Sequence, residues 1–486
     1  MREHWPSANG LVFVIAIFQL LAFALLAVKA QPVDYGALML GALSVAILLF
    51  QYLVFVRVFP GLDRWILIIA NMLVSLGFIL QYRLNPDMCI RQMQWFGVAV
   101  VCMVVALIAV RYWTWLDKLS YVYMGITLAF LVLTLLFGSR EGGAKSWFSF
   151  GTVSFQPSEL GKILLVFALA SAMKERRSLW RLIPLGIFAA VSVGLLVLQK
   201  DLGAALLYFS TSIVVFYIAT SNLLLTGAAL GAAGVGSVAA YKLFSHVRVR
   251  IAAWQNPWAD VEGGGYQIVQ SLIAIASGGL LGLGLGLGSP KSIPAYHTDF
   301  IFAVICEEFG VLVGIAVILF YVVLILRGAR IALDAGQTFY KLVAIGCTAM
   351  VALQTFIIVG GVIKMIPLTG VTLPFVSYGG SSLVTNMVLI GILEAVAVRN
   401  HAMRESAMGP VEIPGYNIDE DAYYDEDAYD QEYADYEDEY YDQDDDEAQQ
   451  AYDQEDEYPQ DGQEDAVERR QSGESGTRGK KGGGRK

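Results

Sequence analysis

A carboxylate stands where a polar segment enters an apolar one, at Asp299. Residues 293–300, Ile-Pro-Ala-Tyr-His-Thr-Asp-Phe, run directly into an apolar stretch that extends to Leu326. An acid at the end of a membrane segment is costly unless it faces water, a partner or a substrate. Asp299 is therefore a candidate functional residue, and accepting a proton is chemistry that a single carboxylate can supply.

Other charged residues fall at the ends of further apolar stretches. They are Lys145, Glu159, Lys162, Asp201 and Lys364. Residues 157 and 158 predict a helix start with Ser158 as the N-cap, so that Glu159 and Lys162 share one helix face. Taken alone, such a pair is best explained as a local ion pair. Together with the other charges it favours a polar cavity that opens outward.

Two acids follow Asp299 along the predicted helix 299–326, at Glu307 and Glu308. On a continuous helix Glu307 lies about 80° round from Asp299 and Glu308 about 180°. Glu307 is therefore the cavity candidate, and Glu308 is expected to pair with a neighbouring helix. Structural pairing explains both acids equally well.

Two segments near the end of the apolar region could line such a cavity. The segment 367–375 contains two prolines and a glycine, which predicts irregular or half-helical backbone of the kind tolerated beside a cavity. The next segment opens the last apolar stretch with Ser377, Gly379, Gly380 and Ser381. The free N–H groups of such a helix start suit a phosphate, although ordinary helix capping explains the same residues equally well.

Composition places these residues in a polytopic membrane protein. Of 486 residues 56% are hydrophobic and 16% charged, which excludes an ordinary soluble domain. A membrane helix needs about 20 apolar residues. The predicted all-α fold has about twelve such spans, near 10–28, 36–56, 65–81, 93–110, 119–137, 159–173, 182–198, 202–219, 223–241, 299–326, 340–360 and 383–399.

Charge sets the expected orientation. One set of short loops is rich in arginine and lysine, most densely in the Lys-Glu-Arg-Arg run at 174–177, so the positive-inside rule places both termini in the cytoplasm. The segments 138–158, 242–298 and 361–382 then face outward, and 242–298 is a large outer loop. Within it the glycines of 278–288 alternate without a βαβ unit, which favours a flexible loop against the membrane over a nucleotide site.

The charge balance changes abruptly near the C-terminus. Residues 411–486 hold 27 of the 44 acidic residues and 7 of the 33 basic ones, with too few aliphatic residues for a core. Such a tail is expected to be disordered, either simply solvating or binding a basic cytoplasmic partner. The predicted organisation is an N-terminal helix pair at 1–60, a membrane core at 61–405 and the tail at 406–486. The basic excess of the core is spread over loops, so nucleic-acid binding is not predicted.

Several motifs together resemble one family. The motifs are Gly-Ala-Lys-Ser-Trp at 143–147, Gln-Pro-Ser-Glu at 156–159, Asp-Leu-Gly at 201–203, Gly-Tyr-Gln at 265–267, His-Thr-Asp-Phe-Ile-Phe-Ala at 297–303 and Ser-Tyr-Gly-Gly-Ser-Ser at 377–382. Over residues 60–400 they resemble the SEDS proteins RodA, FtsW and SpoVE, and are most like actinobacterial RodA. The resemblance implies a peptidoglycan glycosyltransferase that polymerises lipid II outside the cytoplasmic membrane, for elongation or division, beside a class B penicillin-binding protein.

The resemblance also implies roles for individual residues. Asp299 matches the family's essential aspartate, the general base, whereas Glu159 and Lys162 match polar residues of a central cavity. On the phosphate side, Lys162, Arg250 or Lys364 would stabilise the leaving pyrophosphate, alone or with Mg²⁺ or Mn²⁺, and no organic cofactor is expected. Two spans are additional to the usual ten, and Ala295 stands where the family usually has a glutamate.

Two other functions fit part of the pattern. A lipid II flippase or another transporter would also have many spans and charged cavity residues. Its site, however, would lie near the midplane and open to both sides, whereas most of the charges here fall at the outer ends of helices. A scaffold that recruits wall enzymes through the acidic tail could coexist with catalysis.

Overall fold

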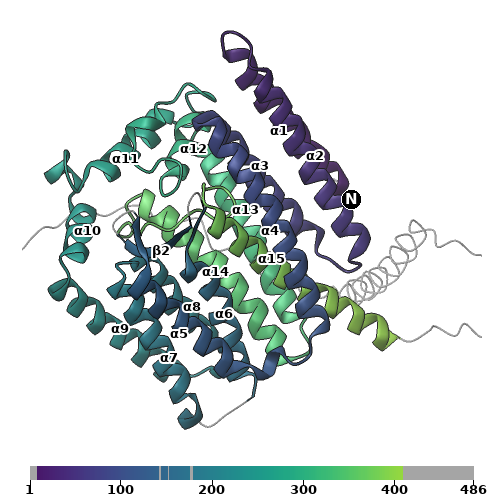
Figure 1. The fold of residues 1–486 in the computed structure, drawn as a ribbon, viewed down its shortest axis with the longest axis vertical. Helices are drawn as coiled ribbons and strands as arrows, with labels where there is room; N and C mark the ends of the chain where they lie inside the picture. Colours follow the sequence, from purple (N-terminus) through teal and green to yellow (C-terminus); the bar gives the residue numbers. More distant parts are fainter. Residues whose placement is uncertain (1–7, 142–143, 151–152, 176–178, 409–486) are drawn as a thin grey trace, which may run out of the picture. The chain divides into compact units, whose positions relative to one another are not determined.

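The computed structural model describes residues 8–141, 144–150, 153–175 and 179–408. Within them the chain is a bundle of long apolar helices with a small sheet at one end (Figure 1). The expected acidic tail lies outside the described residues, apart from its first three positions at the end of the last helix.

Ten of the described helices are long and apolar enough to cross a membrane. They are α1 Ala8–Lys29, α2 Tyr35–Val58, α3 Arg64–Leu84, α4 Pro86–Tyr112, α5 Ser120–Phe137, α8 Leu202–Thr220, α9 Leu223–Leu243, α13 Val311–Leu333, α14 Thr338–Val362 and α15 Gly380–Met408. The other two predicted spans form the shorter helices α6, Pro157–Met173, of 17 residues, and α7, Ile183–Leu198, of 16. The described residues therefore contain ten candidate spans of full length rather than the twelve predicted.

The predicted outer loop and its neighbours contain ordered elements. Residues 242–298 include α10, Ser245–Gln255, and α11, Tyr266–Gly278. The expectation of a purely helical chain was incomplete, because β1 Ser139–Glu141, β2 Ala144–Phe150 and β3 Val153–Phe155 form an antiparallel sheet in that order. Residues 144–150 alternate polar and aromatic side chains in part, and such a period of two fits a short strand better than a helix.

The predicted helix 299–326 is broken. It forms α12, Ile301–Phe309, and then α13, with Gly310 between them at φ +88°. A Cβ at Gly310 would lie 2.3 Å from the carbonyl oxygen of Leu280. The break between the two helices therefore requires a glycine, both for this close approach and for its positive φ. Helix α12 also begins only at Ile301, so Asp299 lies in the turn before it, and the angles expected between Asp299 and the two glutamates on one continuous helix do not apply.

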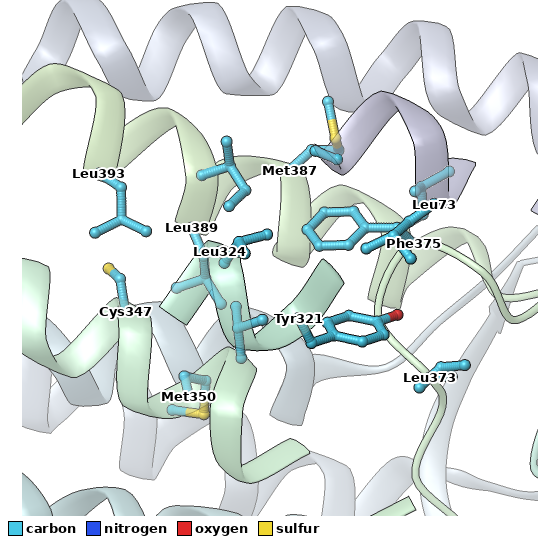
Figure 2. Packing of buried hydrophobic residues seen from close by; sticks show 14 of the residues in the cluster. Leu73, Tyr321, Leu324, Cys347, Met350, Leu373, Phe375, Met387, Leu389 and Leu393 are labelled. Carbon is cyan, nitrogen blue, oxygen red and sulfur yellow. The ribbon is translucent and has the colours of Figure 1, made fainter. Parts of the chain in front are cut away.

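The segment 366–379 is irregular, as predicted, but it contains no half-helix. It lies on a core built from α3, α13, α14 and α15, where Phe375 and Leu373 are buried beside Tyr321 (Figure 2). The hydroxyl of Tyr321 donates to the carbonyl of Pro374 at 2.5 Å. Helix α3 meets the same segment at Gly77, where a Cβ would lie 2.9 Å from the carbonyl oxygen of Val376.

The close approach at Gly77 can be tested by adding one methyl group. Gly77→Ala would force α3 away from fixed backbone, and we expect it to lower the free energy of unfolding by about 1–3 kcal/mol. Gly97→Ala in α4 is the matched control, because nothing lies within 4 Å of its Cβ position. Thermal unfolding of both variants in detergent measures the difference. Equal melting temperatures would contradict the close contact.

Candidate active site

Asp299 is half-buried in a tight turn directly before α12. The carbonyl of Ala295 accepts the backbone N–H groups of Thr298 and Asp299, both at 3.1 Å, and that of Phe300 at 3.3 Å. Ala295 itself has φ +56°, a conformation that non-glycine residues rarely adopt. The turn therefore fixes the backbone that carries the carboxylate.

The segment before α15, where phosphate binding was predicted, holds this turn through Ser377 and Tyr378. The hydroxyl of Ser377 donates to the carbonyl of Thr298 at 2.6 Å, and the N–H of Tyr378 donates to the carbonyl of His297 at 2.9 Å. The side chain of Gln92 in α4 bonds both the carbonyl of Ser377, at 3.1 Å, and the N–H of Gly379, at 3.3 Å.

Two further phosphate candidates have structural contacts. A Cβ at Gly380 would lie 2.4 Å from the ring of Trp95, so the glycine allows close packing of α15 on α4. The hydroxyl of Ser381 accepts the N–H of Gln156 at 3.3 Å. Capping and packing thus account for these two members of the Gly-Ser motif.

Arg250 from α10 reaches the irregular segment opposite Asp299. Its Nη1 donates to the carbonyl of Thr369 at 3.0 Å, and a Cβ at Gly370 would lie 3.3 Å from Oδ2 of Asp299. Burial raises the pKa of the Asp299 carboxyl to about 6, although a hydrogen bond from Thr298 and the charge of Arg250 lower it. Burial also lowers the pKa of Arg250, while Asp201 and Asp299 oppose that change. The predicted base and one predicted phosphate ligand are therefore brought together.

Asp201 joins the same neighbourhood as the N-cap of α8. Its Oδ1 accepts the N–H of Ala204 at 3.0 Å, and its Oδ2 accepts the side chain of Gln156 at 2.9 Å and the hydroxyl of Ser158 at 3.4 Å. The prediction that Ser158 is the N-cap of α6 is therefore wrong. Gln156 has that position, because proline is favourable as the first residue of a helix.

Glu159 and Lys162 form a closed, buried pair. The ammonium of Lys162 donates to both carboxylate oxygens of Glu159, at 2.7 and 2.8 Å, and to Oε1 of Gln354 at 3.1 Å. Lys162 is 1% exposed and Glu159 7%. The amide of Gln354 continues to the carbonyl of Thr372 at 2.9 Å, and the hydroxyls of Thr372 and Ser382 are 2.6 Å apart. The pair therefore connects α6 to α14, to the irregular segment and to α15.

The remaining two predicted lysines make structural contacts. The ammonium of Lys145 donates to the carbonyls of Leu135 and Leu136, at 2.7 and 3.0 Å, and so caps the last turn of α5. The carbonyl of Lys364 accepts the indole N–H of Trp254 in α10 at 3.2 Å, which ties α10 to the end of α14.

Sequence reasoning missed His246 and Lys200. Burial, together with the charges of Lys200 and Arg250, lowers the pKa of His246. His246 and Arg250 are four residues apart on α10, and this i,i+4 spacing was a signal that could have found the histidine. Lys200 and Arg250 therefore both lie close enough to His246 to act on its charge.

No described residues form a group of three or more His, Cys, Asp or Glu side chains that could hold a metal ion. A divalent cation would therefore need oxygen ligands from a phosphate substrate, as is common for Mg²⁺. Asp299 and Asp201, which both act on the charge of Arg250, are the carboxylates nearest to where such a phosphate is expected.

Comparisons with known proteins identify the family of the chain. Residues 64–402 match the model of the cell cycle protein family of FtsW, RodA and SpoVE. The peptidoglycan glycosyltransferase RodA of Mycobacterium leprae is 38% identical over 369 residues, covering 70% of this chain and 79% of that protein. Stage V sporulation protein E of Bacillus subtilis is 35% identical over 352 residues, covering 68% of this chain and 95% of that protein. The chain belongs to this family, the SEDS family.

Solved structures share the fold. A chain of a peptidoglycan synthase complex that coordinates polymerization and crosslinking matches with a TM-score of 0.58 and 27% identity, covering 70% of this chain and 99% of that chain. Thermus thermophilus RodA matches with a TM-score of 0.52 and 28% identity, over 70% of this chain and 97% of that chain. The predicted resemblance to RodA is confirmed.

The buried Glu159–Lys162 pair gives a stability test. Lys162→Met leaves the Glu159 carboxylate buried without its cation, and we expect it to cost about 3–5 kcal/mol. The double variant Glu159→Leu with Lys162→Met should recover most of that loss, because two apolar side chains need no partner. Unfolding of both variants in detergent is the measurement. A double variant as unstable as the single one would contradict the pairing.

Proposed function

We propose that this protein is a peptidoglycan glycosyltransferase that polymerises lipid II, with Asp299 as the general base. The observation that carries the assignment is a single half-buried carboxylate, held in a fixed turn, with a pKa of about 6 and Arg250 beside it. A base is most effective when its pKa lies near the operating pH. The position falls inside the family-matched region 64–402.

The reaction needs one proton acceptor and one site of positive charge. The hydroxyl of the acceptor sugar attacks the anomeric carbon of the donor, and its proton passes to the Asp299 carboxylate. The new glycosidic bond forms as the bond to the undecaprenyl pyrophosphate breaks, and that group leaves with the electron pair. Arg250 is placed to stabilise the charge that develops on the pyrophosphate. Lys162 is committed to Glu159, so we give the phosphate role to Arg250 before Lys162 or Lys364.

We also propose that the active site faces outward and that both termini are cytoplasmic. The support is the excess of arginine and lysine in the alternate loops. Helices α6 and α7 are consecutive, so the termini lie on the same side whether or not this pair crosses the membrane in full. In this orientation Asp299, Asp201 and Arg250 lie at the outer end of the bundle, where a membrane-anchored pyrophosphate would enter.

The proposed partner is a class B penicillin-binding protein. The support is the similarity to a chain of a synthase complex in which polymerization is coordinated with crosslinking. We further propose that Mg²⁺ or Mn²⁺ assists the departing pyrophosphate. The 27 acidic residues of 411–486, against 7 basic ones, support a basic cytoplasmic partner or a scaffold role for the tail. No step of the reaction above is assigned to a metal.

Replacing the base tests the function directly. Asp299→Asn keeps the size of the side chain but removes the proton acceptor, and we expect lipid II polymerisation to fall by at least about 10²-fold. The assay uses purified full-length protein with its partner. The matched control is Asp87→Asn, at an exposed acid that begins α4, which should polymerise normally. Near-normal polymer from Asp299→Asn would exclude this residue as the base.

The pH dependence follows from the sign of the pKa shift. Only the ionised carboxylate accepts a proton, so kcat/KM should fall about tenfold per unit as pH drops below the Asp299 pKa of about 6. Arg250 lowers that pKa, so Arg250→Gln should move the midpoint to higher pH. An unchanged midpoint in that variant would show that the titrating group lies elsewhere.

A further inference from the structure

The N-terminal helix pair, α1 and α2, lies outside the family-matched residues 64–402, yet its connecting turn contacts the core. Asp34 caps α2 through Oδ1, which accepts the N–H of Gly36 at 2.9 Å. Its Oδ2 accepts the hydroxyl of Tyr82 near the end of α3, at 2.5 Å. The ring of Tyr82 also packs against Phe23 of α1, with centroids 5.4 Å apart. The N-terminal helix pair therefore contacts the end of α3 by a hydrogen bond from its turn and by ring packing from α1.

The next residue of α3, Arg83, connects this contact to α12. Its Nε lies 3.1 Å from Oε1 of Glu308, and its Nη2 donates to the carbonyl of Gly288 at 3.1 Å. The expected pairing of Glu308 with a neighbouring helix is thereby confirmed. The ammonium of Lys29, the last residue of α1, reaches the carbonyl of Leu285 at 3.4 Å.

The glycine segment, residues 278–289, is hydrogen-bonded to Glu307 and Glu308 and is not the free loop that the sequence predicted. Oε2 of Glu308 accepts the N–H of Gly286 at 3.0 Å, and Oε1 of Glu307 accepts the N–H of Ser289 at 2.9 Å. The backbone carbonyls of Glu307 and Glu308 accept two further N–H groups of the segment, both at 2.9 Å. A Cβ at Gly282 would lie 2.3 Å from the carbonyl oxygen of Glu308, which explains the glycine there.

The glycine segment is bonded at both ends of residues 289–309, the stretch that carries Asp299. The stretch begins at Ser289, which is bonded to Glu307, and it ends in α12, which carries Glu307 and Glu308. A shift of α12 against the glycine segment would therefore move the turn at 295–300. A displacement of about 1 Å at a reacting group can cost 10²-fold in rate.

We propose that the N-terminal helix pair positions the catalytic turn, with Asp34, Tyr82 and Lys29 as positioning residues that act through Arg83, Glu308 and the glycine segment. The catalytic part of this inference rests on the proposed function of Asp299. The structural part, that the helix pair keeps residues 278–300 ordered, does not depend on that function.

The experiment compares two hydroxyl deletions in the full-length protein with its partner. Tyr82→Phe removes the bond to Asp34 and keeps the ring, whereas Tyr35→Phe removes a hydroxyl from a side chain that is 76% exposed. We expect Tyr82→Phe to speed backbone hydrogen exchange in 278–300 and to lower kcat about fivefold to tenfold, with KM for lipid II within about twofold. Tyr35→Phe should change neither.

A second variant keeps the proposal testable if Tyr82→Phe fails to fold. Lys29 is exposed, so Lys29→Met should fold normally and show the same changes at smaller size, while Lys29→Arg should keep the wild-type values. Unchanged exchange in both Tyr82→Phe and Lys29→Met would overturn the proposal, and so would faster exchange with unchanged kcat. If Asp299→Asn still polymerises lipid II, the assignment of Asp299 as the base fails, but the exchange data still decide whether the helix pair holds the segment.

Discussion

Irregular backbone inside a bundle of apolar helices needs a partner for every polar group, and this constraint organises the whole site. The two irregular stretches that form the site, 278–300 and 366–379, obtain many of their partners from buried glutamine and serine side chains. Gln92 bonds the start of α15, Gln354 bonds the carbonyl of Thr372, and Ser377 bonds the carbonyl of Thr298. The same bonds that satisfy the backbone also fix the turn in which Asp299 lies.

The buried acids also need partners, and they differ in whether they have a fixed one. Glu159 is paired with Lys162 and Glu308 with Arg83, so these acids are neutralised and hold helices together. Asp299 has no such fixed cation at contact distance among the described ion pairs. It has Arg250 nearby, and burial keeps its pKa close to neutral pH. A carboxylate in this condition can exchange a proton near that pH.

Much of the chemistry could be predicted from the sequence because it depends on local order. An acid at a helix entry, an apolar run of sufficient length and a motif such as His-Thr-Asp-Phe are all readable along the chain. The positions of Asp299, of ten spans and of the irregular segment 367–375 followed from these signals. The contacts of Lys145 and of the Gly-Ser motif could not be predicted in this way, because a basic or glycine-rich helix end looks the same whether it caps a helix or binds a phosphate.

The sequence by itself therefore determined the membrane fold, the family and the position of the acid before α12. Only the tertiary structure decided which charges pair with each other, where the predicted helix 299–326 breaks, and that the glycine segment is fitted onto Glu307 and Glu308. At the break, the backbone of Leu280 passes close to Gly310. The Lys162 ammonium donates a further hydrogen bond to Gln354 of α14. Such contacts join residues far apart in the chain, and local pattern carries no information about which of them meet.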